Sequence, residues 1–187
     1  MFKVLILLIC LPFTGIGFGD DEIDFNDKRL LSGLKKKNIS GLMQLEPVNI
    51  SKETLNPAQL QGKFFKTTGN EINSEVKYVY VGRVNSCRTG GCSVSGNSAV
   101  NIESEYFDYF IFFDSRKTVI QVEVFNYQAT HGYEITAKGW LKQFTGFSGK
   151  DSLEVNKNID SISGATVSVY AITTDVQEKT RLLKSML

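Results

Sequence analysis

A chain of 187 residues with a formal net charge of +1 is long enough for one folded domain and too short for two domains of ordinary size. Charged residues make up 22% of the chain and hydrophobic residues 42%, a balance that is typical of globular proteins and excludes a disordered chain. The near-zero charge gives no support to a nucleic-acid partner or to a strongly anionic membrane partner.

The first 19 residues have the order of a cleaved secretory signal. Lys3 precedes the apolar run 4–11, which is too short to span a bilayer, and small residues end the segment just before Asp20. A buried N-terminal strand is the alternative. We expect residues 1–19 to be removed and residues 20–187 to form a single domain, which is formally neutral because Lys3 is the only charge lost.

The three cysteines fall into two groups. Cys10 lies inside the apolar run, where a lipid anchor is an alternative, although the bulky residues before it are unlike a lipoprotein signal. Cys87 and Cys92 enclose a short loop with two adjacent glycines. Such a pair in an exported chain indicates a structural disulfide. A redox-active pair is the alternative reading, although the spacing is not Cys-x-x-Cys.

The pattern after residue 20 predicts an α+β domain, an antiparallel sheet with flanking helices. The expected elements are a helix at 24–37, strands at 77–84, 106–113 and 118–127, a short helix at 137–144 and a long helix at 164–186. The short turn 114–117 makes the last two strands a hairpin. Ser163 is the expected N-cap of the long C-terminal helix.

Two periodic patterns predict which side chains form the core. Helical spacing in the last helix predicts one buried stripe, which consists of Ala165, Val169, Ile172, Val176 and Leu183. Strand alternation divides the aromatic residues of 106–113 between two faces, with Phe107, Tyr109 and Phe113 on one face and Tyr106, Phe110 and Phe112 on the other. Most of these rings are expected to be core rather than ligand contacts.

The stretch that carries chemistry contains Asp160, Ser163, Gly164, Ala165 and Thr166, at the start of the last helix. A helix N-terminus presents unpaired backbone N–H groups and a positive dipole end, which suit a phosphate. Gly164 and Ala165 allow close approach to the backbone, and Thr166 adds a hydroxyl. From the residues alone, an ordinary helix start with Ser163 as its cap is the better explanation of the stretch.

The same stretch resembles the flavinylation motif of FMN-binding domains, Asp-x-x-Ser/Thr-Gly-Ala-Thr, and all its fixed positions match. These domains occur in peripheral subunits of the sodium-pumping NADH:quinone reductase and the Rnf complex of bacteria, in small exported proteins and in extracellular flavin reductases. The resemblance implies that Thr166 carries FMN through a phosphoester bond. It also implies a magnesium-dependent flavin transferase that makes this bond with FAD as the donor.

The resemblance extends over residues 75–185. After the hairpin, family members have a segment like His-x-Glu-Thr-Pro-Gly, which Thr130 and Gly132 match, while Ala129 and His131 replace the usual Glu and Pro. Thr130, Gly132 and His131 are therefore the candidate flavin contacts outside the motif. His131, the only histidine, is either such a contact or a polar loop residue. A lone histidine indicates neither a metal site nor a hydrolase.

These observations predict a bacterial electron carrier with covalent FMN, located in the periplasm or cell envelope. Its expected partners are the flavin transferase and a membrane redox complex or another exported redox protein. The chain has no Rossmann-type glycine fingerprint, so direct oxidation of NAD(P)H is not expected. Two alternatives stay open, namely a secreted binding module without a cofactor and an exported flavin reductase that acts on a small acceptor.

Overall fold

The computed structural model describes residues 22–41, 44–49, 60–68, 74–88 and 104–186. The predicted signal at 1–19, the alternative lipid site at Cys10 and the disulfide partner Cys92 lie outside these residues. Export and the disulfide between Cys87 and Cys92 therefore stay predictions.

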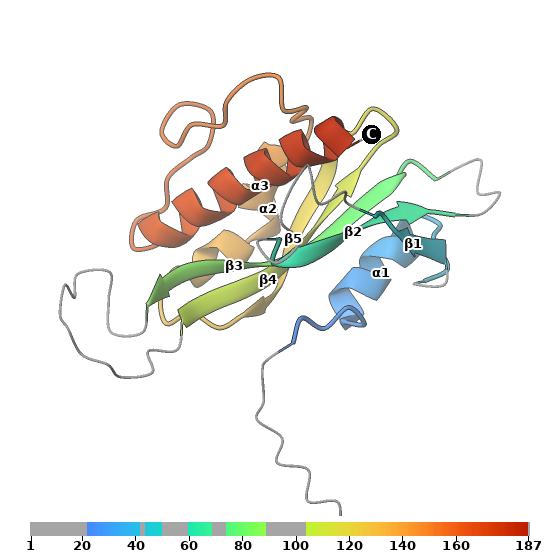
Figure 1. Cartoon of the computed structure of the whole chain (residues 1–187). Coiled ribbons are helices and arrows are strands. Elements are labelled where there is room, and N and C mark those ends of the chain that lie inside the picture. The colour runs from blue at the N-terminus through green and yellow to red at the C-terminus, as the bar shows by residue number, and fades with distance from the viewer. Residues whose placement is uncertain (1–21, 42–43, 50–59, 69–73, 89–103, 187) are drawn as a thin grey trace, which may run out of the picture.

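The centre of the molecule is a five-stranded antiparallel sheet in which each strand pairs with its neighbours in sequence (Figure 1). The strands are β1 (Leu45–Pro47), β2 (Gly62–Thr67), β3 (Tyr78–Arg88), β4 (Ser104–Phe113) and β5 (Val119–Tyr127). The β4–β5 hairpin and the α+β class are confirmed. The sequence analysis did not predict β1 and β2, which form one edge of the sheet.

The helical elements with described bounds are α1 (Lys28–Lys36), η3 (Tyr133–Thr136), α2 (Lys138–Leu141), η4 (Lys142–Phe144) and α3 (Thr166–Met186). The first helix begins later than the predicted residue 24. The Asp24 carboxylate accepts the Asn26 N–H at 2.8 Å in a local turn, whereas the Asp27 carboxylate accepts the Arg29 N–H at 2.7 Å and caps α1.

The sheet lies between α3 on one face and α1 on the other (Figure 1). All five residues of the predicted α3 stripe are buried, and they belong to the same core cluster as Phe107, Tyr109 and Phe113. On the opposite face, Leu30 and Leu34 of α1 belong to the cluster of Phe110 and Phe112. The predicted alternation of aromatic residues along β4 is therefore confirmed.

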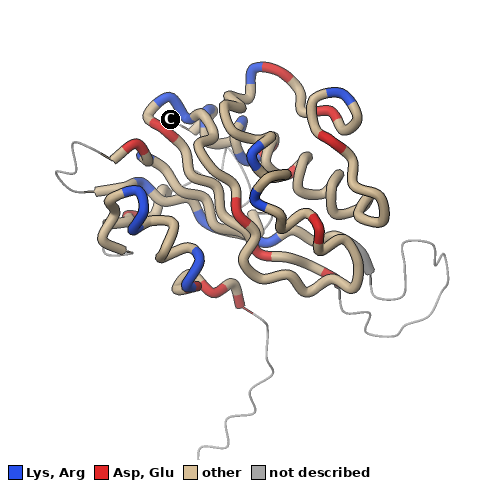
Figure 2. Tube along the Cα trace, turned by 180° about the vertical axis from the view of Figure 1, so that it is seen from behind, with Lys and Arg blue, Asp and Glu red and all other residues tan. Residues whose placement is uncertain are grey.

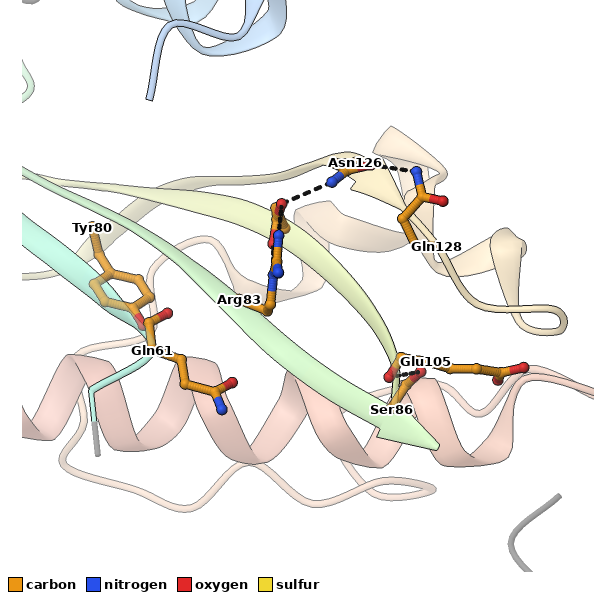
Figure 3. A network of polar contacts seen from close by, with 8 residues as sticks. Gln61, Tyr80, Arg83, Ser86, Glu105, Asn126 and Gln128 are labelled. Carbon is orange, nitrogen blue, oxygen red and sulfur yellow. Dashed lines mark hydrogen bonds and ion pairs between the residues drawn. The ribbon is translucent and has the colours of Figure 1, made fainter. Parts of the chain in front are cut away.

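A buried ion pair lies on the face of the sheet that also carries α1 (Figure 3). The side chain of Asp108 is 0% exposed, and its two oxygens accept from Arg83 Nε at 2.7 Å and Arg83 Nη2 at 2.9 Å. Asn126 Nδ2 donates to the same carboxylate at 2.8 Å, and Gln128 Nε2 donates to Asn126 Oδ1 at 2.7 Å. These contacts link β3, β4 and β5 through side chains in addition to the backbone ladder.

Replacing Asp108 by Ala tests the weight of this ion pair. The change leaves the half-buried Arg83 guanidinium without its carboxylate, and we expect a loss of about 3–5 kcal/mol in the free energy of unfolding. The matched control is Glu154→Ala, which removes the exposed ion pair with Lys157 and is expected to cost less than about 1 kcal/mol. Urea unfolding of both variants measures the difference, and equal losses would contradict the argument.

Candidate functional site

The C-terminal helix begins at Thr166, immediately after a tight turn. The Ala165 N–H donates to the Ile162 carbonyl at 3.1 Å, and Gly164 has a φ of +81°. A positive φ at the third position of such a turn is typical of type II and favours glycine. The predicted helix start at 164 and the predicted cap Ser163 are wrong, because Gly164 is not helical and Ala165, whose carbonyl accepts from the Val169 N–H at 2.9 Å, takes the cap position.

The first turn of α3 is open on the side that a ligand would approach. Thr166 and Val167 are exposed, whereas the methyl group of Ala165 is buried and fixes the helix start to the core. Within the described ranges, the backbone N–H groups of Thr166, Val167 and Ser168 have no hydrogen-bond acceptor. A Cβ built on Gly164 would meet nothing within 4 Å. These features fit a phosphate group esterified to the Thr166 hydroxyl.

The loop before this turn is fixed through its backbone. The Asp160 N–H donates to Gln143 Oε1 at 2.7 Å, and Trp140 Nε1 donates to the Asp160 carbonyl at 2.9 Å. The next residue back, Ile159, is 1% exposed and belongs to the core. The Asp160 carboxylate is exposed and makes no hydrogen bond or ion pair with the part of the chain that the structure describes. The loop is therefore held without using that carboxylate.

The structure brings the second predicted segment, residues 130–132, against the first turn of α3. The Tyr127 hydroxyl lies 3.0 Å from Ser168 Oγ and also donates to the His131 carbonyl. Gly132 is buried, has a φ of +93°, and a Cβ built on it would lie 2.7 Å from Ser168 Oγ. Close contact with α3 thus explains the glycine at position 132.

Thr130 and His131 lie on the exposed side of the same loop. The Thr130 hydroxyl donates to the Glu105 carboxylate, so it is engaged with the end of β4. The imidazole of His131 is exposed, and among the described residues only its backbone carbonyl has a hydrogen-bond partner. The predicted contacts of Thr130, His131 and Gly132 with a flavin stay predictions, although Gly132 packs against Ser168 in the first turn of α3.

Three apolar residues that the sequence analysis did not single out surround this region. In the described part of the chain the exposed large hydrophobic side chains are Tyr133 at 61%, Tyr170 at 50% and Val167 at 41%. Tyr133 follows Gly132, and its ring packs edge-on against Tyr127 with centroids 5.6 Å apart. Val167 and Tyr170 are three residues apart and off the buried stripe of α3, a sequence signal that could have identified them.

A buried polar cluster fixes α3 to the sheet behind the site. The Tyr109 hydroxyl of β4 donates to the Asp175 carboxylate of α3, which also accepts from Lys179 Nζ at 2.6 Å. Burial raises the pKa of Tyr109 and of neighbouring Tyr80 well above the usual value, and the Asp175 charge adds to both shifts. Both phenols therefore stay protonated at neutral pH, which keeps Tyr109 as the donor to Asp175.

Burial also raises the pKa of Tyr127, against the opposing effect of its hydrogen bond with Ser168. This phenol therefore stays protonated at neutral pH too. It keeps one proton to donate to the His131 carbonyl and can accept from the Ser168 hydroxyl. The raised pKa of Tyr127 thus preserves the hydrogen bond from its phenol to the His131 carbonyl at neutral pH.

Residues 106–180 match the family model of the FMN-binding domain. The match runs from β4 into α3 and includes the hairpin, the 130–132 loop and the stretch from Asp160 to Thr166. This part of the chain therefore matches the FMN-binding domain family, and the match supports an FMN-binding domain protein. Comparisons with curated proteins and with solved structures gave no significant match.

The described residues hold neither a metal-binding cluster nor a membrane-spanning helix. They contain no cluster of three or more His, Cys, Asp or Glu side chains arranged to hold a metal ion. None of the helices in this part of the chain has the length and apolar character needed to cross a membrane.

Gly132→Ala tests the contact between the loop and α3. The added methyl group requires a strained positive φ and collides with Ser168 Oγ, so we expect a loss of about 1–3 kcal/mol in the free energy of unfolding. Gly139→Ala is the control, because a Cβ there meets nothing within 4 Å. Thermal unfolding of the two variants measures the difference. A Gly132→Ala variant as stable as the Gly139→Ala variant would contradict the packing described.

Proposed function

We propose that this FMN-binding domain is an extracytoplasmic electron carrier that holds its FMN through a phosphoester bond to Thr166. The observation that carries the proposal is the position of the Thr166 hydroxyl. It is exposed on the first residue of a long helix, directly after a glycine turn, within the matched family segment. A covalent bond would retain the cofactor outside the cytoplasm, where a dissociated flavin is lost.

The helix start supports a tethered phosphate electrostatically. A phosphodiester keeps one negative charge, and the unpaired N–H groups at the start of α3 and its positive dipole end stabilise that charge. The open space around Gly164 leaves room for the phosphate oxygens. Because the buried methyl of Ala165 fixes the turn, the hydroxyl is held in place before attachment.

Asp160 has a different role in this proposal. Its backbone is already held by Gln143 and Trp140, and its carboxylate is exposed and without a partner in the described chain. A carboxylate that the fold does not use is available to the flavin transferase. We therefore assign Asp160 to recognition by that enzyme and Thr166 to the bond itself.

A bound FMN supplies the redox chemistry, and the protein sets its surroundings. The exposed side chains of Tyr133, Val167 and Tyr170 offer apolar area beside Thr166 against which a planar ring system could pack. The rim of the site is otherwise polar and open. This openness favours electron exchange with a partner over the enclosed chemistry of an enzyme.

One observation favours the alternative of a flavin reductase. A groove of about 470 Å³ runs along α3 beside β3 and includes Tyr170, Thr174 and Glu178. Tyr170 lies about one helical turn after Thr166, so a small acceptor bound in this groove would be near the attached flavin. Turnover of small acceptors by the reduced, purified protein, blocked by Thr174→Trp in this groove, would support the reductase in place of the carrier.

Thr166→Val is the decisive substitution for the attachment. Valine matches threonine in size but has no hydroxyl, so we expect complete loss of covalent flavin with a change of less than about 0.5 kcal/mol in stability. The protein is co-expressed with a flavin transferase, and fluorescence of a denaturing gel and peptide mass spectrometry measure the bond. Thr174→Val, an exposed threonine on the same helix, is the matched control and keeps full labelling.

Two further variants separate recognition from attachment. Asp160→Ala is expected to abolish labelling at an unchanged free energy of unfolding. Gly164→Val is expected to block labelling because a side chain at a φ of +81° strains the turn and crowds the hydroxyl. Persistent covalent signal in Thr166→Val would refute the assignment. An unlabelled wild-type chain beside a labelled positive control would favour the cofactor-free binding module.

Export is tested by the N-terminus of the mature protein. We expect Edman sequencing of protein from the native host to begin near Asp20, because signal cleavage follows the small residues before it. The protein is expected in the periplasmic or envelope fraction. An intact Met1 on protein from the cytoplasmic fraction would contradict this localisation.

A further inference from the structure

A second surface lies along the outer edge of β5, the last strand of the sheet. A groove of about 780 Å³ follows this edge between α1 and the segment formed by α2 and η4. Figure 1 shows β5 between these elements, and Figure 2 shows basic positions along α1 at the lower left of that view. The groove involves neither Thr166 nor the 130–132 loop.

The walls of this groove are strongly basic although the chain as a whole is almost neutral. Its charged lining consists of Lys28, Arg29 and Lys36 from α1, Lys138 and Lys142 from the opposite wall, and Glu123 from β5. Lys138 Nζ lies 3.3 Å from Glu123 Oε1, which accounts for the single carboxylate. Both walls of the groove therefore carry positive charge, in contrast to the almost neutral chain as a whole.

The floor of the groove offers backbone hydrogen-bonding groups. At one end of β5, Val119 exchanges hydrogen bonds with Gly146 and Phe147, which cover the edge. At the other end, Arg29 Nη1 donates to the Val124 carbonyl at 2.9 Å, so the backbone groups of Val124 face away from β4. Strand alternation turns those of Val122 the same way. Among the described residues, the N–H groups of Val122 and Val124 and the Val122 carbonyl have no partner beyond β4.

We propose that this groove binds an acidic, extended segment of a partner protein, which adds to the sheet as a strand beside β5. The side chains of an added strand alternate between two directions, toward α1 and toward α2. Lysines lie on both walls, so carboxylates at successive positions of the added strand each face a positive charge. The backbone edge supplies affinity and register, and the two basic walls supply the preference for acidic sequences.

This proposal does not depend on the flavin, and its test uses the full mature chain without cofactor. The probe is a fluorescent peptide that repeats Glu-Glu-Thr-Thr, so that carboxylates point toward both walls, with a Lys-Lys-Thr-Thr repeat as the charge control. A third peptide has the same Glu-Glu-Thr-Thr sequence but carries N-methyl groups on every second amide. These are the amides that would face β5. Fluorescence anisotropy is expected to show saturable binding of the first peptide alone, weakened by added salt.

Charge reversal on the protein locates the binding. Lys36→Glu with Lys142→Glu changes one exposed lysine on each wall, and neither of them has an ion-pair partner in the described chain. We expect about tenfold or greater loss of affinity. Lys150→Glu with Lys157→Glu makes the same change in net charge outside the groove and is expected to bind as the wild type does.

Amide exchange of ¹⁵N-labelled protein tests the strand pairing itself. The peptide is expected to slow exchange at Val122 and Val124 and to leave Gln121 and Glu123, which already face β4, unchanged. Equal affinity for the N-methylated peptide would overturn strand addition. No binding would show that the lysines protect the edge from pairing. Binding to anionic phosphatidylglycerol vesicles, but not to the peptide, would assign the groove to a membrane surface.

Discussion

The position of the functional site depends on how α3 is fixed to the sheet. Its apolar stripe from Ala165 to Leu183 is buried against the aromatic face of β3 and β4. The contact of Tyr109 with Asp175, supported by Lys179, adds a directional polar connection in the middle of the helix. A helix held along its whole length has a fixed starting point. The Thr166 hydroxyl therefore has a defined place on the molecule although it is exposed.

The turn before the helix places the Thr166 hydroxyl at the surface. Gly164 with its positive φ reverses the chain, Ala165 buries its methyl group, and Thr166 then emerges at the surface. The loop on the other side is fixed by Gln143 and Trp140 through backbone groups. Among the described residues, neither the Thr166 hydroxyl nor the Asp160 carboxylate has a hydrogen-bond partner, and both residues are exposed, as the proposed modification requires.

The sequence correctly predicted the elements in which the hydrophobic periodicity agrees with the burial of the side chains. The β4–β5 hairpin and the α3 stripe were predicted because long periodic segments decide their own faces. The motif around Thr166 was found through resemblance, since its residues alone suit an ordinary helix start. The strand at Leu45–Pro47 is short and contains proline, and Gly62–Thr67 carries two lysines, so neither has a strand pattern. The predicted start of α3 was wrong because Ser163 and Gly164 suit a helix cap and a first helical residue as well as they suit the turn that the structure has there.

The surroundings of Glu123 on β5 connect the two surfaces. Gln121 and Glu123 alternate with valines, a pattern that suits a strand face in contact with water, yet Glu123 is buried, pairs with Lys138 and accepts from Gln121 Nε2. Residues 138–143 contribute to both surfaces. Trp140 and Gln143 hold the Asp160 loop, while Lys138 and Lys142 line the groove on β5. A partner strand seated on β5 would therefore contact the same short helical segment that holds the attachment loop. The proposed docking surface and the proposed attachment site therefore share one helical segment of the fold.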